Sequence, residues 1–170
     1  VAVSFKLQAI FIIPVFILVY VLNKKFSLTD FLLIPIGFLV SSFPGMICSG
    51  KGIRGLFEIY FGQVQQEESL VLNYPNIYYW ISASHYELYV KLGICLLFTI
   101  FAICGFYLLT QKAYISNEQI VALGMWCVLC VVYFCPKMHE RYGFVAEVLS
   151  IIWLVGNKKW IWYPIIINLT

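Results

Sequence analysis

The chain alternates between long apolar blocks and short polar or charged segments. A membrane-crossing helix needs about 20 mainly apolar residues to traverse roughly 30 Å of hydrocarbon. The blocks are Val1–Leu22, Phe31–Ile47, Leu88–Leu109, Ile120–Cys135, a stretch across Pro136 that reaches Gly156, and the short run Trp160–Thr170. This pattern predicts an all-α fold, a polytopic transmembrane helical bundle of about five spans plus a partial sixth.

The composition supports a membrane protein. Of the 170 residues, 62% are hydrophobic and 11% are charged, whereas soluble domains carry about 25% charged residues. Eleven basic residues against eight acidic ones provide no basic patch for nucleic acid. A soluble enzyme, a disordered tail and a nucleic-acid binder are therefore excluded. We expect an integral, multi-pass protein surrounded by membrane lipid.

We treat residues 1–170 as a single transmembrane region. The chain starts at Val1 rather than Met, and its last apolar run stops at Thr170, part-way through a span. We therefore expect a piece of a longer membrane protein. A small complete protein that has lost its initiator Met is the alternative.

One connection, residues 48–87, is much longer than the usual helix connection of about 2–8 residues. Within it, the apolar positions of Gly50–Gln63 keep a helical spacing, which is typical of a helix in the plane of the membrane interface. The aromatic cluster Asn73–Trp80 follows. An interfacial aromatic belt explains its rings well but its two asparagines poorly.

The charges of the short turns indicate which side of the membrane each turn faces. By alternation of spans, three connections share one side, and their lysines are Lys24, Lys25, Lys112, Lys158 and Lys159. Basic residues in short loops favour the cytoplasm. The start of the first span, the loop 48–87 and the segment Pro136–Tyr142 are then expected on the outer face.

The segment Pro136–Tyr142 concentrates ionisable groups where a span is predicted to start. Proline suits the first turn of a helix, and a helix N-terminus presents free N–H groups and about half a positive charge. The expected opening turns carry Lys137, His139, Glu140 and Arg141. The cations favour an anion site for phosphate, and Glu140 could orient a cation or bind a sugar hydroxyl. The alternative is a charged cap that snorkels into the headgroups.

Three more polar residues are expected near this segment. Glu147 follows Glu140 by seven residues, which predicts the same helical face about two turns, roughly 10 Å, deeper. It could relay protons or contact substrate, or it could be a protonated residue bonded to a neighbouring helix. Lys6 and Gln8 could line the same cavity, although snorkelling also explains Lys6.

The cysteines predict no metal site. Cys127 and Cys130 have the spacing of a metal half-site, but no second pair or nearby histidine accompanies them. Free cysteine behaves as a small hydrophobic residue. The sequence requires no cofactor, and the need for a divalent metal stays open.

Three motifs occur in a characteristic order: Ser4–Gln8 before a Pro-containing span, the run from Asn76 through Tyr78 to Trp80, and Pro136–Tyr142. Together they resemble the C-terminal half of integral-membrane GT-C glycosyltransferases, particularly bacterial relatives of GPI mannosyltransferase II. The His139-Glu140-Arg141 run is also similar to the His-Glu-Lys element of dolichol-phosphate-glucose-dependent glucosyltransferases.

The resemblance implies a mannosyl- or other hexosyltransferase with a polyprenyl-phosphate sugar donor and a glycan or lipid-linked acceptor. It implies an outer or luminal site in a bacterial plasma membrane or an endoplasmic reticulum membrane. By this resemblance the donor phosphate or sugar is held by Lys6, Gln8, Lys137, His139, Glu140 and Arg141, and Asn76 and Tyr78 contact sugar or acceptor.

The chain departs from that family at the catalytic base, which is usually an Asp in the first outer loop. The only aspartate, Asp30, is expected on the cytoplasmic side. We therefore expect no catalytic residue in this piece, which by itself would be inactive. A transporter or flippase component and a surface-polysaccharide polymerase component remain alternatives.

Overall fold

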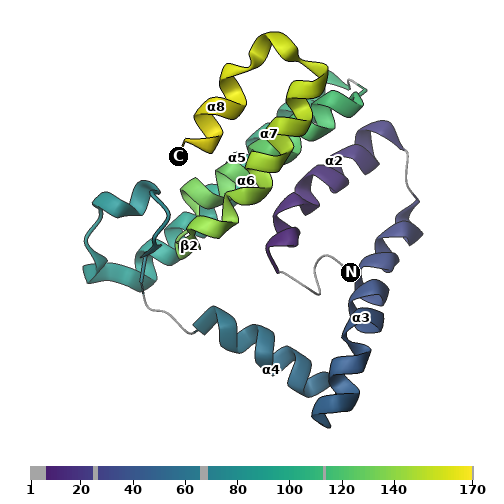
Figure 1. Cartoon of the computed structure of the whole chain (residues 1–170), viewed down its shortest axis with the longest axis vertical. Coiled ribbons are helices and arrows are strands. Elements are labelled where there is room, and N and C mark those ends of the chain that lie inside the picture. The colour runs from purple at the N-terminus through teal and green to yellow at the C-terminus, as the bar shows by residue number, and fades with distance from the viewer. Residues whose placement is uncertain (1–6, 25–26, 66–68, 113, 170) are drawn as a thin grey trace. The chain divides into compact units, whose positions relative to one another are not determined.

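The computed structural model describes residues 7–24, 27–65, 69–112 and 114–169, which are mostly helical. The helices are α2 (Ile13–Asn23), α3 (Leu33–Ser49), α4 (Gly52–Gln65), α5 (Tyr86–Gln111), α6 (Asn117–Phe134), α7 (Phe144–Gly156) and α8 (Trp162–Asn168) (Figure 1). Short 3-10 turns are η1 (Leu7–Ile12), η2 (Leu28–Leu32), η3 (Ile77–Trp80), η4 (Ala83–His85), η5 (Glu140–Tyr142) and η6 (Lys158–Trp160). Two two-residue strands are β1 (Val71–Leu72) and β2 (Met138–His139).

Three helical stretches of the described chain are long and apolar enough to cross a membrane. They are Leu28–Ser49, α5 and α6. The apolar stretch Ile10–Asn23 is shorter. Helix α7 has 13 residues, so at 1.5 Å per residue it extends about 20 Å, less than the roughly 30 Å of a hydrocarbon core.

The chain forms two compact units, one of residues 1–10 and 26–68 and one of residues 11–25 and 69–170. In the first unit, Ser27 and Asp30 form a capping box: the Ser27 amide donates to Asp30 Oδ2 at 2.7 Å, and Ser27 Oγ accepts from the Thr29 amide. This capping box marks the start of the apolar stretch Leu28–Ser49, which contains α3. No side chain of α3 is buried within the unit, as expected of a helix whose surroundings are lipid.

A glycine-based turn joins α3 to α4. Gly50 and Gly52 have φ angles of 66° and 59°, a left-handed conformation that glycine adopts without steric cost. The helix expected at Gly50–Gln63 is present as α4, with bounds shifted by two residues, and its place in the plane of the interface stays a prediction.

In the second unit, contacts between sequence-distant turns define one end, which we call the lysine end (Asn23–Lys24, Lys112, Tyr114–Glu118 and Gly156–Lys159). The Asn23 side chain donates to the Ile115 carbonyl oxygen at 2.7 Å and accepts from the Ile115 amide at 2.9 Å. The Asn157 side-chain Nδ2 donates to Glu118 Oε2 at 3.5 Å. Helix termini that the alternation of spans predicts on one side thus lie together.

The opposite end, which we call the junction end, is formed by Phe11 and residues 69–85 and 135–143. The Phe11 and Tyr142 rings lie edge to face, with centroids 6.3 Å apart. A cluster of buried Tyr74, Val131, Val132 and Met138 holds this end together.

The prediction that a helix begins at Pro136 is wrong. Helix α6 ends at Phe134, the backbone is extended at Cys135, and Lys137 has a φ of 63°. Strand β2 and the 3-10 turn η5 follow, and the next α-helix begins at Phe144. Lys137, His139, Glu140 and Arg141 therefore precede α7 instead of occupying its first turns.

Candidate functional site

A pair of short parallel strands organises the junction end. Val71 lies opposite Met138 and Leu72 opposite His139, and the Lys137 amide donates to the Leu70 carbonyl oxygen at 2.9 Å. Asn73 forms a further bridge with His139. The long loop and the basic segment, more than sixty residues apart, are thus fixed side by side.

Asn76 and Tyr78 are both 4% exposed, and their polar atoms bond to the main chain. Asn76 Oδ1 accepts from the Tyr78 amide at 3.0 Å and caps η3, while its Nδ2 donates to the Cys135 carbonyl oxygen at 3.5 Å. The Tyr78 hydroxyl donates to the Phe134 carbonyl oxygen at 2.9 Å. Burial raises the pKa of the Tyr78 phenol. These bonds anchor the loop to the end of α6.

Tyr74 is the second buried phenol of the loop. Its ring lies edge to face with Tyr133, with centroids 5.6 Å apart. The pKa of Tyr74 is raised by burial, then by Tyr133, and also by the negative charge of Glu147. A Cβ added at Gly143 would lie 3.1 Å from Tyr74 Cε2, so Gly143 leaves room for this ring where α7 starts.

Glu147 and Glu140 belong to two successive helical segments rather than to one α-helix. Glu140 belongs to η5, and Glu147 occupies the first turn of α7, where it is half-buried. A carboxylate in that turn stabilises the helix through its dipole. The expected difference in depth between the two carboxylates stays a prediction.

The basic residues of the junction have different environments. Lys137 Nζ lies 5.2 Å from the centre of the Tyr86 ring, within the range of a cation–π contact. The half-buried His139 ring packs edge to face on Tyr142, with centroids 5.5 Å apart. Glu140 and Arg141 are exposed. Arg141 makes no ion pair with the acidic residues that the structure describes, so its guanidinium is accessible to an anion from solvent.

Two expected site residues are not brought into the junction by any described contact. Lys6 lies outside the described residues, and Gln8 belongs to η1 but its side chain is not described.

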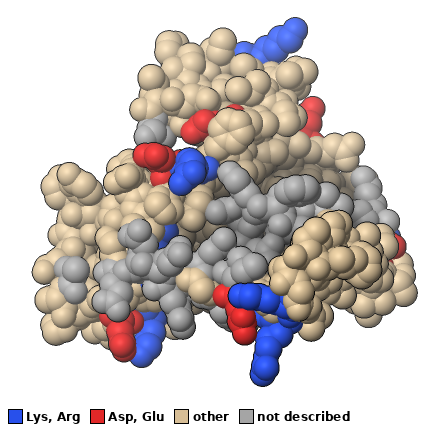
Figure 2. Space-filling model, turned by 60° about the horizontal axis from the view of Figure 1, so that its bottom comes forward, with Lys and Arg blue, Asp and Glu red and all other residues tan. Residues whose placement is uncertain are grey.

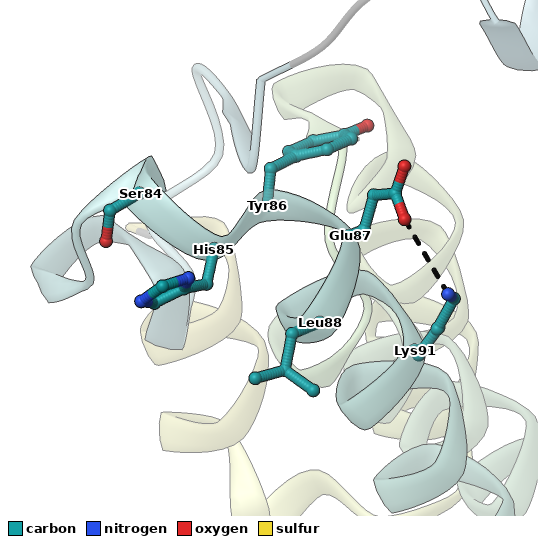
Figure 3. Close-up of a pocket in the computed structure, with 6 residues that line it drawn as sticks. All are labelled: Ser84, His85, Tyr86, Glu87, Leu88 and Lys91. Carbon is teal, nitrogen blue, oxygen red and sulfur yellow. Dashed lines mark ion pairs between the residues drawn. The ribbon is translucent and has the colours of Figure 1, made fainter.

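The described residues of the junction end and of the start of α5 line two hollows. One, of about 420 Å³, is lined by residues of the segment Ser69–Ile81, among them Asn73, Tyr74, Pro75, Tyr78 and Tyr79. The other, of about 510 Å³, surrounds the start of α5 and is lined by Ser84, His85, Tyr86, Glu87, Leu88 and Lys91 (Figure 3).

The second hollow carries an exposed ion pair, in which Lys91 Nζ lies 3.7 Å from Glu87 Oε2. Figure 3 shows the His85 ring pointing away from this pair. Because both partners are largely exposed, solvent screens their attraction, and the pair contributes little to stability.

Charge is sparse beyond these groups. On the face shown in Figure 2, the described Lys, Arg, Asp and Glu side chains stand in small separate groups on an uncharged surface. Within the described ranges, no three His, Cys, Asp or Glu side chains lie close enough to hold a metal ion. All six cysteines are free thiols.

Sequence reasoning missed Asn73 and Tyr79 as accessible polar groups of the long loop. The signal for Asn73 was its place before Tyr74-Pro75, because Asn in such a position is typical of a turn. In the structure Asn73 has a φ of 65°. The strand pair had no sequence signal, since two residues are too few to show an alternating pattern.

Comparison of this chain with protein-family models, with curated proteins and with solved structures finds no match.

Proposed function

We propose that this chain is part of a membrane glycosyltransferase that binds a polyprenyl-phosphate-linked sugar at its junction end. In this proposal the chain passes the membrane five times, through α2, α3, α5, α6 and α7, and α8 begins a sixth passage. Because α7 is shorter than the hydrocarbon core, it crosses the membrane together with the turns η5 and η6 at its two ends. The lysine end faces the cytoplasm and the junction end faces outward, in a bacterial plasma membrane or an endoplasmic reticulum membrane.

The observation that carries the proposal is the strand pair, which fixes the basic segment next to the loop. It places His139 beside Asn73 and keeps the exposed Arg141 three residues before the start of α7. The N-terminus of α7 adds a partial positive charge on the same side. A phosphate next to Arg141 would gain a charge-assisted hydrogen bond, and guanidinium geometry suits two phosphate oxygens at once.

The proposed reaction is a displacement at the anomeric carbon of the donor sugar. The bond between that carbon and the acceptor oxygen forms while the bond to the lipid phosphate oxygen breaks. Arg141, His139 and Lys137 stabilise the charge that develops on the departing phosphate. The acceptor proton passes to a carboxylate that the proposal assigns to no residue of this chain. Glu140 orients the cations or accepts from a sugar hydroxyl.

Asn76 and Tyr78 take a different part in this proposal from the one implied by the resemblance. Their buried polar atoms are engaged by main-chain groups, so they position the loop rather than reach into solvent. In this proposal, accessible residues of the same loop contact the sugar instead.

The test is transfer of sugar from polyprenyl-phosphate mannose by the intact protein carrying Arg141→Ala. We expect turnover to fall about 100-fold, as when one charge-stabilising donor is removed from an active site. The matched control is Arg54→Ala, because Arg54 is also exposed but lies on α4. Both variants should insert and unfold like the parent. Equal transfer by the Arg141→Ala variant and the parent would contradict the proposal.

A further inference from the structure

The hollow lined by residues 69–81 differs in chemistry from the basic segment beside it. None of the described residues that line it is Lys, Arg, His, Asp or Glu. Its wall combines the apolar surfaces of Val71, Pro75 and Ile81 with the Tyr79 phenol and the Asn73 amide. Its volume, about 420 Å³, lies within the range of small-molecule sites, about 300–1,000 Å³.

Two side chains in this hollow have polar groups available to a ligand. Asn73 is exposed, and Tyr79 is 66% exposed. Neither side chain makes a hydrogen bond to another residue of the described ranges, unlike Asn76 and Tyr78. Unbonded amide and phenol groups beside apolar walls suit a ligand that has both apolar faces and hydroxyl edges.

The backbone under these two side chains is held in place. Asn73 bridges to His139, and the Tyr79 amide donates to the Asn76 carbonyl oxygen at 3.1 Å. The Tyr79 ring also lies edge to face with Trp80, with centroids 5.4 Å apart. A preorganised aromatic face loses little conformational entropy on binding.

We infer that this hollow is a subsite for one pyranose ring of an uncharged glycan, contacted by the Tyr79 ring and the Asn73 amide. The inference rests on the proposed function and deepens it, because it separates a neutral sugar subsite from the phosphate subsite at Arg141. A pyranose has apolar C–H faces that pack on an aromatic ring and hydroxyl groups that exchange hydrogen bonds with an amide. The described lining offers no cation to a phosphate, and the accessible amide disfavours an acyl chain.

The subsite lies beside the phosphate group that the proposed function requires. Asn73 and His139 are bridged partners, and Arg141 follows His139 by two residues. A sugar that bonds to the Asn73 amide would therefore lie on the side of the hollow that adjoins His139, as a transfer reaction next to a phosphate demands.

The test is saturation-transfer NMR with methyl α-D-mannopyranoside and methyl α-D-glucopyranoside on the chain in phosphatidylcholine nanodiscs. We expect saturation transfer to at least one glycoside, and about tenfold weaker binding in Tyr79→Ala, the effect of losing one aromatic contact. Tyr79→Phe should keep most of the binding, because the ring face remains. Asn73→Gly should weaken binding, since glycine preserves the left-handed backbone but removes the amide.

Two control variants test whether the loss of binding is specific to the hollow. Tyr107→Ala removes a comparably exposed tyrosine of α5, 60% exposed, and should leave glycoside binding unchanged. Arg141→Ala should also leave glycoside binding unchanged while lowering transfer by the intact protein about 100-fold, so failure of the phosphate site and failure of the sugar subsite give different results.

Three outcomes would overturn the inference. The first is the absence of saturation transfer to either glycoside, and the second is equal binding by the parent and the Tyr79→Ala variant. The third is a loss of nanodisc incorporation in Tyr79→Ala without a change in glycoside binding. That result would identify Tyr79 and the 87% exposed Trp80 as interfacial lipid contacts instead.

Discussion

The Tyr78 hydroxyl donates a hydrogen bond of 2.9 Å to the carbonyl oxygen of Phe134, the last residue of α6. The carbonyl groups at the end of a helix have no partner within the helix. Tyr78 therefore satisfies one of them and, in the same contact, anchors the long loop to the place where α6 stops.

Gly93 is required for this contact. A Cβ added at Gly93 would collide with the Tyr78 hydroxyl and lie 3.1 Å from Pro136 Cδ. Gly93→Ala should lower the free energy of unfolding by about 1–3 kcal/mol, the usual effect of overpacking. The matched control is Gly105→Ala on the same helix, where the nearest atom, Leu18 Cδ2, is 3.8 Å away. That change should be neutral or stabilising by up to about 1 kcal/mol. Unfolding in mild detergent measures both, and equal effects would contradict the packing at Gly93.

The buried phenols predict a loss of stability at alkaline pH. Folding raises the pKa values of Tyr74 and Tyr78 above the ordinary value of 10.0, chiefly through burial. The contribution of the two phenols to the free energy of unfolding is therefore complete below about pH 10. It is lost as the pH rises toward the folded-state pKa values. Tyr74→Phe should make the fall in stability above pH 10 shallower, as followed by unfolding at a series of pH values. An unchanged slope would show that Tyr74 does not ionise with unfolding.

Asn23 ties α2 to the turn between α5 and α6 through two hydrogen bonds to Ile115. Asn23→Asp removes the donor and places a carboxylate against the Ile115 carbonyl oxygen. We expect a loss of about 1–3 kcal/mol in the free energy of unfolding at pH 7. The variant contains its own control: below about pH 4 the new carboxyl group is protonated, regains a donor, and should recover part of the loss. A loss in the free energy of unfolding that does not change with pH would argue against the two hydrogen bonds between Asn23 and Ile115.

The two ends of the second unit should be accessible from opposite sides of the membrane. Trp80 lies at the junction end and Lys158 at the lysine end, and both are exposed. In a background without native cysteines, a membrane-impermeant maleimide should label Trp80→Cys in intact cells. It should label Lys158→Cys only after permeabilisation. The cysteine-free parent is the control, and labelling of both variants in intact cells would rule out the proposed orientation.

The sequence by itself determined where apolar helices form and which of their connecting turns lie at the same end. Apolar blocks and caps such as Ser27 with Asp30, or Ser116 with Gln119, are local, so they can be read without knowledge of distant contacts. The gathering of Asn23, Ile115 and Asn157 at one end follows from simple alternation of antiparallel helices.

Only the tertiary structure decided what happens between Phe134 and Phe144. The proline and the cations at 136–141 are compatible with a helix start, but the backbone there instead pairs with Val71–Leu72, a partner more than sixty residues earlier. The same non-local pairing buries Asn76 and Tyr78 and leaves Asn73 and Tyr79 open to solvent. A hydropathy pattern reports which residues avoid water, whereas the choice among neighbouring polar groups depends on main-chain donors and acceptors that the fold brings from elsewhere in the chain.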